Sequence, residues 1–251
     1  FNGAEPISYE LVKRFLDAFA AHGLRPGSMF PVYGLAEASL AVAMPPLMSG
    51  LRKTEVDRNH LGIGDQVRPT DAPKQKLDLV PVGRAIPHCT FRIGEGVPDG
   101  VVGPIWIKGD NVTREIRTAE GDIDPLVDGW YDTGDLGFVL DCALHICGRV
   151  KEMAIVNGQN VFPYDIEAVA AEVDGLEPGK VVAAGVRDPK SGREVLALFI
   201  LYRKNEGFAE LAQRVREQVT QRTGIAPTIL EPVTKIPKTT SGKIQRVRMA
   251  Q

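Results

Sequence analysis

The pattern of apolar and polar residues predicts a first regular element over residues 8–22. Apolar side chains recur there every three or four positions, which is the period of a helix with one apolar face. Ser8 precedes the run and is suited to cap its start, while Gly23 is suited to end it. The residues that form the predicted apolar face are Leu11, Val12, Phe15, Ala18 and Phe19.

The pattern changes after residue 45. Residues 45–78 contain several prolines and glycines, scattered charges and little periodicity, which predicts a long loop or insertion. Residues 79–147 instead contain short apolar runs separated by Gly, Pro and Asp, for example at 90–93, 103–107 and 138–140. That spacing predicts a small β-barrel or a twisted sheet.

Helices and strands alternate beyond residue 149. A helix is predicted from Pro163, where a missing N–H does no harm, and two strands follow at 181–186 and 195–202. A second helix, with a last strand after it, carries the apolar face Phe208, Leu211, Val215 and Val219. This order predicts a compact α+β unit of about 100 residues, with a boundary at residues 148–151. The fold class is therefore expected to be mixed α/β.

Composition narrows the function classes. The 251 residues are 43% hydrophobic and 25% charged, which is ordinary for a globular protein with a sizeable core. A net charge of −2, from 30 basic and 32 acidic residues, argues against a nucleic-acid partner. No apolar run approaches the ~20 residues of a membrane span. Three cysteines exclude a disulfide scaffold and suit a reducing compartment, so we expect a cytoplasmic location.

The start of the chain suggests that it is a fragment of a larger protein. Its first residue is Phe1 rather than Met, and the segment after it has the character of sequence from within a protein.

Two polar segments are candidates for chemistry. Residues 131–135, Tyr-Asp-Thr-Gly-Asp, form either a simple polar turn between strands or a ligand site in which Asp135 accepts hydrogen bonds from a ribose diol. Residues 237–243, Pro-Lys-Thr-Thr-Ser-Gly-Lys, are flexible, cationic and rich in hydroxyls. They are not a Walker motif, because Pro237 and Ile244 occupy positions where that motif needs Gly and Ser or Thr.

Other reactive residues do not form a known pattern. Cys142, His145 and Cys147 have no usual zinc spacing and no evident fourth ligand, although His145 and Cys147 would share one face of a strand. The sequence also contains no Gly-x-Ser-x-Gly elbow, which disfavours a serine hydrolase.

Five motifs in a fixed order resemble the adenylate-forming superfamily, which contains acyl-CoA synthetases, amino-acid adenylation domains and luciferases. They are Asn-Gly-Ala-Glu-Pro at 2–6, Tyr-Gly-Leu-Ala-Glu at 33–37, Tyr-Asp-Thr-Gly-Asp at 131–135, Gly-Arg-Val-Lys-Glu at 148–152 and the segment 237–243. Within the superfamily the chain most closely resembles fatty acyl-AMP ligases. The first two motifs and Asn-Gly-Gln-Asn at 157–160, which leads into Pro-Tyr-Asp-Ile-Glu, point to that group.

The resemblance implies a two-step reaction with ATP and Mg²⁺ as cofactors. A fatty acid is activated to an acyl-adenylate with release of pyrophosphate, and the acyl group then passes to the phosphopantetheine thiol of an acyl carrier protein. It also implies that residues 1–148 are the end of a large ATP- and acyl-binding domain, with an insertion near 45–78. Residues 149–251 would form a mobile small domain.

The resemblance also implies roles for individual residues. Gly3, Ala4 and Glu5 line the adenine slot, Tyr33 stacks on the purine, and Gly34 and Ala36 belong to the same nucleotide site. Glu37 holds Mg²⁺, and Asp135 binds the ribose hydroxyls. Arg149 reaches the ribose or phosphates, Lys243 stabilises charge at the α-phosphate and acyl carboxylate, and Lys151 is the pivot between the domains.

Two departures from the family pattern are present. The phosphate-binding loop expected upstream of Asn2 is absent, so we expect this chain alone to be inactive. Residues 108–115 lack the aromatic ending expected there.

Three alternatives stay open. An acyl-CoA synthetase shares every motif but uses coenzyme A, and an insertion that bridges the two domains would disfavour it. A non-catalytic adenylate-binding or carrier-docking module, or an amino-acid adenylating domain, is also compatible with parts of the pattern.

Overall fold

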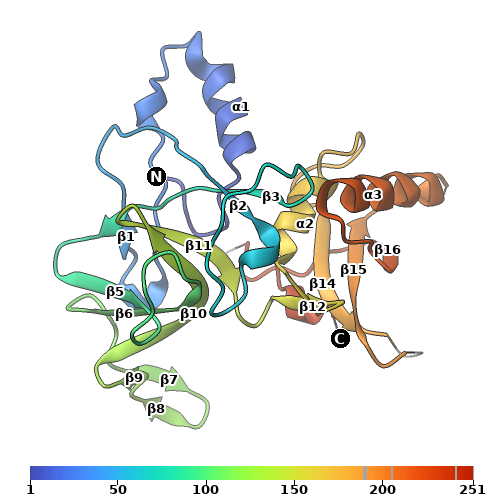
Figure 1. Cartoon of the computed structure of the whole chain (residues 1–251). Helices are drawn as coiled ribbons and strands as arrows, with labels where there is room; N and C mark the ends of the chain where they lie inside the picture. Colours follow the sequence, from blue (N-terminus) through green and yellow to red (C-terminus); the bar gives the residue numbers. More distant parts are fainter. Residues whose placement is uncertain (189–190, 205, 241, 251) are drawn as a thin grey trace. The chain divides into compact units, whose positions relative to one another are not determined.

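The computed structural model describes residues 1–188, 191–204, 206–240 and 242–250 (Figure 1). Its helices and strands confirm the mixed α/β class. The chain divides into two compact units. The first comprises Phe1–Val56, His60–Pro69 and Asp78–Val150, and the second comprises Asp57–Asn59, Thr70–Leu77 and Lys151–Gln251.

The first helix, α1 (Tyr9–Ala20), confirms the element predicted over residues 8–22. The Leu11 backbone N–H donates to the Ser8 hydroxyl at 3.3 Å, so Ser8 caps the helix as expected. Val12 is buried, whereas Leu11, Phe15 and Phe19 are each nearly half exposed. The apolar face of α1 is therefore only partly covered by the described part of the chain.

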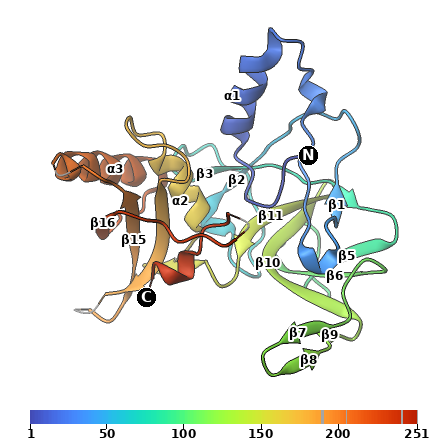
Figure 2. The same cartoon turned by 180° about the vertical axis from the view of Figure 1, so that it is seen from behind.

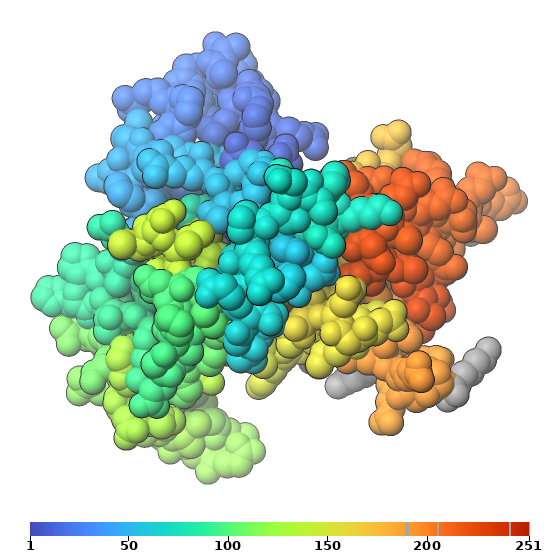
Figure 3. Space-filling view, in the orientation of Figure 1, coloured from blue at the N-terminus to red at the C-terminus, as the bar shows by residue number. Residues whose placement is uncertain are grey.

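The segment predicted as a long loop at 45–78 is partly structured. It contains strands β2 (Thr54–Asp57) and β3 (Lys76–Leu79), which pair with each other, and a short 3-10 helix, η3 (Arg58–His60). Figure 3 shows part of this insertion, in cyan, on the molecular surface. Its ordered strands follow from burial of Val56, Leu61 and Leu77, apolar residues too widely spaced to produce a visible period in the sequence.

A five-stranded sheet forms the centre of the first unit, as the short apolar runs predicted. Four strands follow the order β11-β10-β6-β5, and β9, which lies outside this order, pairs with β10. Its hydrophobic core includes Tyr33, Val42, Ile105, Ile107 and Leu144. The strands are β5 (Cys89–Ile93), β6 (Gly103–Gly109), β9 (Leu126–Val127), β10 (Trp130–Leu140) and β11 (Ala143–Arg149).

Two short strand pairs complete this unit. They are β1 (Ala43–Met44) with β4 (Arg84–Ala85), and β7 (Ile116–Thr118) with β8 (Gly121–Ile123).

Residues 131–135 do not form a simple polar turn between strands, one of the two interpretations given above, because they lie within β10. The register of β10 against β6 shifts between Asp132 and Leu136, so the segment is a bulge in a continuous strand. Gly134 has φ +70°, a value that favours glycine. The same polar residues that form turns also satisfy the backbone of a bulge, which explains the misassignment.

The second unit has the predicted alternation of helices and strands. Its sheet has the order β14-β15-β16, with β14 antiparallel and β16 parallel to β15. The elements are β14 (Val181–Arg187), β15 (Glu194–Leu201), β16 (Ile229–Val233), α2 (Pro163–Ala170) and α3 (Phe208–Thr223), preceded by the hairpin β12 (Ala154–Val156) and β13 (Gln159–Val161). Apolar residues of both helices and of β12 to β15 share one core. Figures 1 and 2 show the two helices beside the strands of this unit.

A buried ion pair joins η3 to α2 within the second unit. Arg58 donates to the Asp165 carboxylate and, at 2.6 Å, to the Lys76 backbone oxygen. Both side chains of the pair are at least nine-tenths buried. Burial raises the pKa of Asp165, and the Arg58 cation opposes that shift. Residues of the insertion are thus fixed to the first turn of α2.

No helix among the described residues is long and apolar enough to cross a membrane.

His145, considered above for metal binding, has a structural environment in the first unit. Its ring stacks on Phe138 with 4.7 Å between centroids. Its Nδ1 lies 3.0 Å from the Ala143 carbonyl oxygen, and its Nε2 lies 2.8 Å from the Thr54 hydroxyl. A carbonyl only accepts, so Nδ1 carries the proton and Nε2 accepts from Thr54. Burial lowers the pKa of His145 to about 4.

This shift predicts a loss of stability in mild acid. The unfolded chain binds a proton at His145 near pH 6.5 and the folded chain only near pH 4, so stability is complete above pH 6.5 and falls as the pH drops through that interval. Across this interval the His145 pKa shift should lower the free energy of unfolding by on the order of 3 kcal/mol in total. Denaturant unfolding of the chain at several pH values between 4 and 7.5 measures it.

A His145→Gln variant should have a flatter pH dependence in this interval. His88→Gln is the matched control, because it removes an exposed histidine and leaves the buried His145 in place. Equal slopes for the parent and His145→Gln would contradict the prediction.

Candidate nucleotide site

The bulge in β10 positions Asp135. The Thr133 hydroxyl donates to the Ile105 carbonyl oxygen at 2.8 Å and accepts from the Asp135 backbone N–H at 3.1 Å. The Gly134 N–H donates to Asp132 Oδ1 at 2.9 Å. The first of these bonds reaches β6 and the other two are local; together they replace the sheet bonds that the bulge interrupts, and they hold the Asp135 backbone in one conformation.

The Asp135 carboxylate is the centre of a hydrogen-bonded cluster. The Tyr33 hydroxyl donates to Oδ2 at 2.7 Å, and Arg149 Nε donates to Oδ1 at 2.9 Å. Pairing of β10 with β11 places Arg149 directly opposite Asp135. Asp135 is buried, whereas 55% of the Arg149 side chain is exposed. The cluster therefore exposes the Arg149 cation to solvent while its partner, the Asp135 carboxylate, is buried and held in place.

Tyr33 serves as a donor in this cluster. Burial, and then the neighbouring Asp135 charge, raise the pKa of Tyr33 well above its usual value, so the hydroxyl keeps its proton. Its ring belongs to the hydrophobic core of the unit. Stacking of a purine on Tyr33 stays a prediction.

The segment with Gly3, Ala4 and Glu5 follows an isolated β-bridge to the segment that leads to Tyr33. Asn2 and Pro31 form a parallel bridge, and the Val32 N–H donates to the Asn2 oxygen at 2.8 Å. A Cβ on Gly3 would lie only 2.7 Å from the Val32 oxygen, so this close approach requires glycine. Ala4 has φ +71°, a conformation that L residues rarely adopt.

Gly34 and Ala36 lie between Tyr33 and Glu37. A Cβ on Gly34 would lie 1.6 Å from the Leu40 oxygen, so the chain can fold back here only with glycine. Ala36 is exposed and begins the short 3-10 helix η2 (Ala36–Ala38), which carries Glu37.

Glu37 is half-buried, and hydrogen bonds from a distant segment hold its turn. The Thr113 N–H donates to the Glu37 backbone oxygen at 2.7 Å. Asn111 Nδ2 donates to the Ala38 and Ala41 oxygens at 2.9 and 2.8 Å. Burial, and then the Glu37 charge, raise the pKa of Tyr131. Glu37 is thus an acidic group close to the motif that carries Asp135.

The donor set can contribute to a magnesium site but not complete one. No group of three or more His, Cys, Asp or Glu residues in the described ranges could hold a metal ion. Mg²⁺ in nucleotide sites commonly uses one or two carboxylates, with phosphate and water oxygens completing its shell. A single carboxylate at Glu37 is compatible with that arrangement.

Lys243 belongs to the second unit and lies in a closed loop. Lys238 and Ile244 form an antiparallel bridge, the Thr239 N–H donates to the Lys243 oxygen at 2.8 Å, and the Lys243 N–H donates to the Thr239 hydroxyl at 3.0 Å. The Lys243 side chain is exposed. Ser241, part of the predicted motif, lies outside the described residues.

The structure brings three of the predicted site residues together and places two others in the second unit. Tyr33, Asp135 and Arg149 are directly bonded. Lys243 and Lys151 belong to the second unit. Lys151 is exposed and directly follows Val150, the last residue of the first unit. The roles assigned to all these residues stay predictions.

Sequence reasoning missed several supporting residues. Thr133 was inside a recognised motif, and Asn111 was inside the stretch that departs from the family pattern. Glu167 was also inside a recognised motif, but its bidentate ion pair with Arg246 gave no local signal because the two residues are 79 positions apart in sequence.

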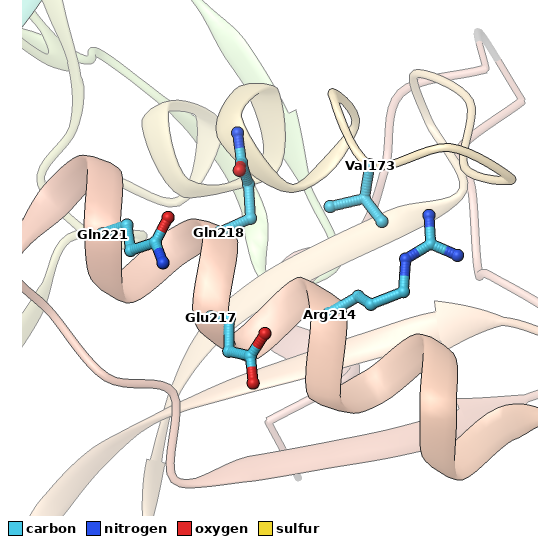
Figure 4. A pocket seen from close by; sticks show the side chains of 5 residues that line it. All are labelled: Val173, Arg214, Glu217, Gln218 and Gln221. Carbon is cyan, nitrogen blue, oxygen red and sulfur yellow. The ribbon is translucent and has the colours of Figure 1, made fainter.

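A shallow hollow on the second unit contains none of the predicted site residues. It is lined by Val173, Arg214, Glu217, Gln218 and Gln221 (Figure 4). Arg214 donates to the Asp174 oxygen at 2.8 Å and Gln218 to Glu172 at 2.9 Å. These two side chains therefore stabilise the packing of α3 against the end of α2.

Comparison with known proteins supports the family resemblance. The model of the AMP-binding enzyme family matches residues 1–116. The chain is 34% identical over 274 residues to the long-chain-fatty-acid–AMP ligase FadD26 of Mycobacterium tuberculosis, covering 98% of this chain and 46% of that protein. The chain thus spans about half the length of the curated relatives that it matches.

Solved structures of adenylate-forming enzymes are also similar to this chain. A structure from a study of fatty acyl-adenylate ligases from E. coli and L. pneumophila superposes with a TM-score of 0.86 and 30% identity, covering 99% of this chain and 45% of that chain. A multidomain structure of a keto acid-selecting NRPS module gives a TM-score of 0.83 and 32% identity, covering 99% and 22%. Along nearly its whole length, the chain is therefore similar to adenylate-forming enzymes, and the resemblance predicted from its five motifs is confirmed.

Proposed function

We propose that the chain functions in ATP-dependent activation of a fatty acid to an acyl-adenylate. The observation that carries this proposal is the Asp135 cluster. It combines a fixed carboxylate for a diol with an exposed guanidinium for anionic oxygens, on motifs arranged as in the adenylate-forming enzymes. The similarity to a long-chain-fatty-acid–AMP ligase favours a fatty acid as the acyl substrate.

In the first step, a carboxylate oxygen of the acid bonds to the α-phosphorus of ATP. The bond from that phosphorus to the oxygen bridging to the β-phosphate breaks, and pyrophosphate leaves. Such reactions depend mainly on positioning and charge stabilisation. Each Asp135 oxygen has two lone pairs, so ribose hydroxyls can donate to it while Tyr33 and Arg149 hold it.

The remaining charges have complementary proposed roles. Arg149 contacts ribose or phosphate oxygens with its planar set of donors. Glu37 would hold Mg²⁺, which when bound would neutralise phosphate charge. Lys243 donates to the α-phosphate and acyl carboxylate, where negative charge accumulates in the transition state.

In the second step, a thiol sulfur attacks the acyl carbonyl carbon, the thiol proton is lost, and AMP leaves. We propose the phosphopantetheine arm of an acyl carrier protein as the thiol donor. Lys151 is the proposed pivot by which the second unit withdraws Lys243 between the two steps. A cytoplasmic location stays a prediction.

The insertion supports a carrier protein over coenzyme A as the acceptor. The insertion enters the second unit twice. Asp57–Asn59 and Thr70–Leu77 belong to the second unit, and the residues on either side of each stretch belong to the first. In the second unit Arg58 is buried against Asp165. Rotation of the second unit would have to rearrange these crossings, which would impede the coenzyme A reaction.

Removal of the Lys243 cation tests the first step. Lys243→Ala in the complete enzyme should lower acid-dependent exchange of pyrophosphate into ATP by roughly 100-fold or more, as removal of one oxyanion donor does. Lys238→Ala, an exposed lysine in the same loop, is the matched control. An exchange rate in Lys243→Ala that equals that of the control would refute the assignment.

Disruption of the Arg58–Asp165 pair tests the role of the insertion. Removing one partner would leave a buried charge, whereas an Arg58→Met/Asp165→Leu double variant replaces both charges with apolar groups and should fold. We expect the double variant to form acyl-CoA faster than the parent, with acyl-adenylate formation unchanged.

Arg68→Met is the control for that experiment, because Arg68 is an exposed arginine of the same insertion. If the parent already forms acyl-CoA rapidly, the protein is an acyl-CoA synthetase. If it accumulates acyl-adenylate and the double variant forms no additional acyl-CoA, the tether proposal fails.

A further inference from the structure

Arg246, in the short 3-10 helix η4 (Arg246–Arg248), contacts two carboxylates of the second unit. Its Nε and Nη2 each donate to one oxygen of Glu167 at 2.8 Å, and its Nη1 donates to Glu152 at 3.2 Å. Only 15% of the Arg246 side chain and 13% of the Glu167 side chain are exposed. This is a bidentate, mostly desolvated pair, the strongest geometry for an arginine and a carboxylate.

Glu167 is itself rigidly held. It lies on α2, and its Oε1 also accepts from the Ala183 N–H of β14 at 3.0 Å. Burial raises the pKa of Glu167, and the Arg246 cation opposes that shift. Arg246 is therefore anchored to a helix and a strand of the core.

Arg246 follows the Lys243 loop by three residues. The Gln245 N–H donates to the Pro237 oxygen at 3.0 Å, so the two ends of the loop meet at the residue before Arg246. At the other end Ile236 is buried, whereas Lys243 and its neighbour Gly242 are exposed. An exposed loop has little packing of its own, so its position depends on what holds its ends.

The contact with Glu152 reaches the residue after Lys151. Glu152 and Arg246 line one hollow of the second unit together with Met153, Gly185 and Glu194. The Ile155 N–H donates to Glu194 at 3.2 Å, which fixes the strand that follows Glu152. Arg246 thus bonds both the core and the segment at the predicted pivot.

We propose that Arg246 is a positioning residue for adenylation: its clamp on Glu167 and Glu152 holds the Lys243 loop fixed to the body of the second unit. The inference rests on the proposed function, because it acts through Lys243. Displacement by about 1 Å costs a catalytic group roughly 100-fold in rate. The clamp makes the lysine move with the whole unit rather than with its own loop.

The test measures pyrophosphate exchange by Arg246→Lys in the complete enzyme. Lysine keeps a cation beside Glu167 but cannot bond both of its oxygens and Glu152 at once. We expect a loss of roughly 10- to 100-fold in kcat, with a smaller change in the KM for ATP. Arg248→Lys is the matched control, because Arg248 is exposed in the same short helix.

A double-mutant cycle separates positioning from general damage. In a Lys243→Ala background, Arg246→Lys should cause no further loss, whereas a purely structural defect would lower the rate by the same factor in both backgrounds. Equal factors, or a parent-like rate for Arg246→Lys, would overturn the proposal. If Arg246→Lys does not fold, judged by thermal unfolding, Glu152→Gln decides: it should lower kcat several-fold, and an unchanged kcat refutes the inference.

The proposed function can fail separately. A parent-like rate for Lys243→Ala would remove the catalytic role of the lysine itself. A low rate for Lys243→Ala with a normal rate for Arg246→Lys would remove only the positioning role of Arg246.

Discussion

The bulge in β10 is the constraint on which the candidate site depends. β10 pairs with β6, β9 and β11, so its register orders most of the sheet in the first unit. Extra residues between Asp132 and Leu136 interrupt that register and bring Asp135 between Tyr33 and Arg149. The Thr133 hydroxyl stabilises the interruption by satisfying two backbone groups. A regular strand would lack the local bonds that hold Asp135 in this position.

Buried charge plays the corresponding part in the second unit. Arg58 pairs with Asp165, and Arg246 pairs with Glu167, both against α2. Taking such groups out of water costs several kcal/mol per ion, so each pair must be well formed to be tolerated. Hydrogen bonds have direction, unlike apolar packing, so these pairs also fix where η3 and η4 attach. The fold therefore uses α2 as the attachment point for both the insertion and the C-terminal loop segment.

The two attachments relate differently to the proposed reaction. Arg246 lies next to the loop with the candidate catalytic lysine, and it keeps that loop part of a rigid body. Arg58 lies in the insertion, which contributes residues to both units. One pair would thus determine where the lysine is held, and the other would limit how freely its unit moves. Acyl transfer to a long, flexible phosphopantetheine arm is compatible with such a limit.

The sequence by itself determined the elements with a regular period and the motifs with a fixed order. The helix α1, its Ser8 cap, the strands β5, β6, β14 and β15 and the start of α2 at Pro163 all depend on local preferences, which are written in neighbouring residues. The family resemblance also needed only the order of motifs.

By contrast, the structured insertion and the β10 bulge depend on partners distant in sequence. Val56 and Leu77 form strands because each has the other segment to pair with. Residues 131–135 continue a strand because their first residues pair with β6 and β9 and their last residue pairs with β11. Only the tertiary structure decided that Tyr33 binds Asp135, that Asn111 holds the Glu37 turn, and that Arg246 closes on Glu167. Those contacts join residues 70 to 102 positions apart, and no local pattern records which distant group will satisfy a buried charge.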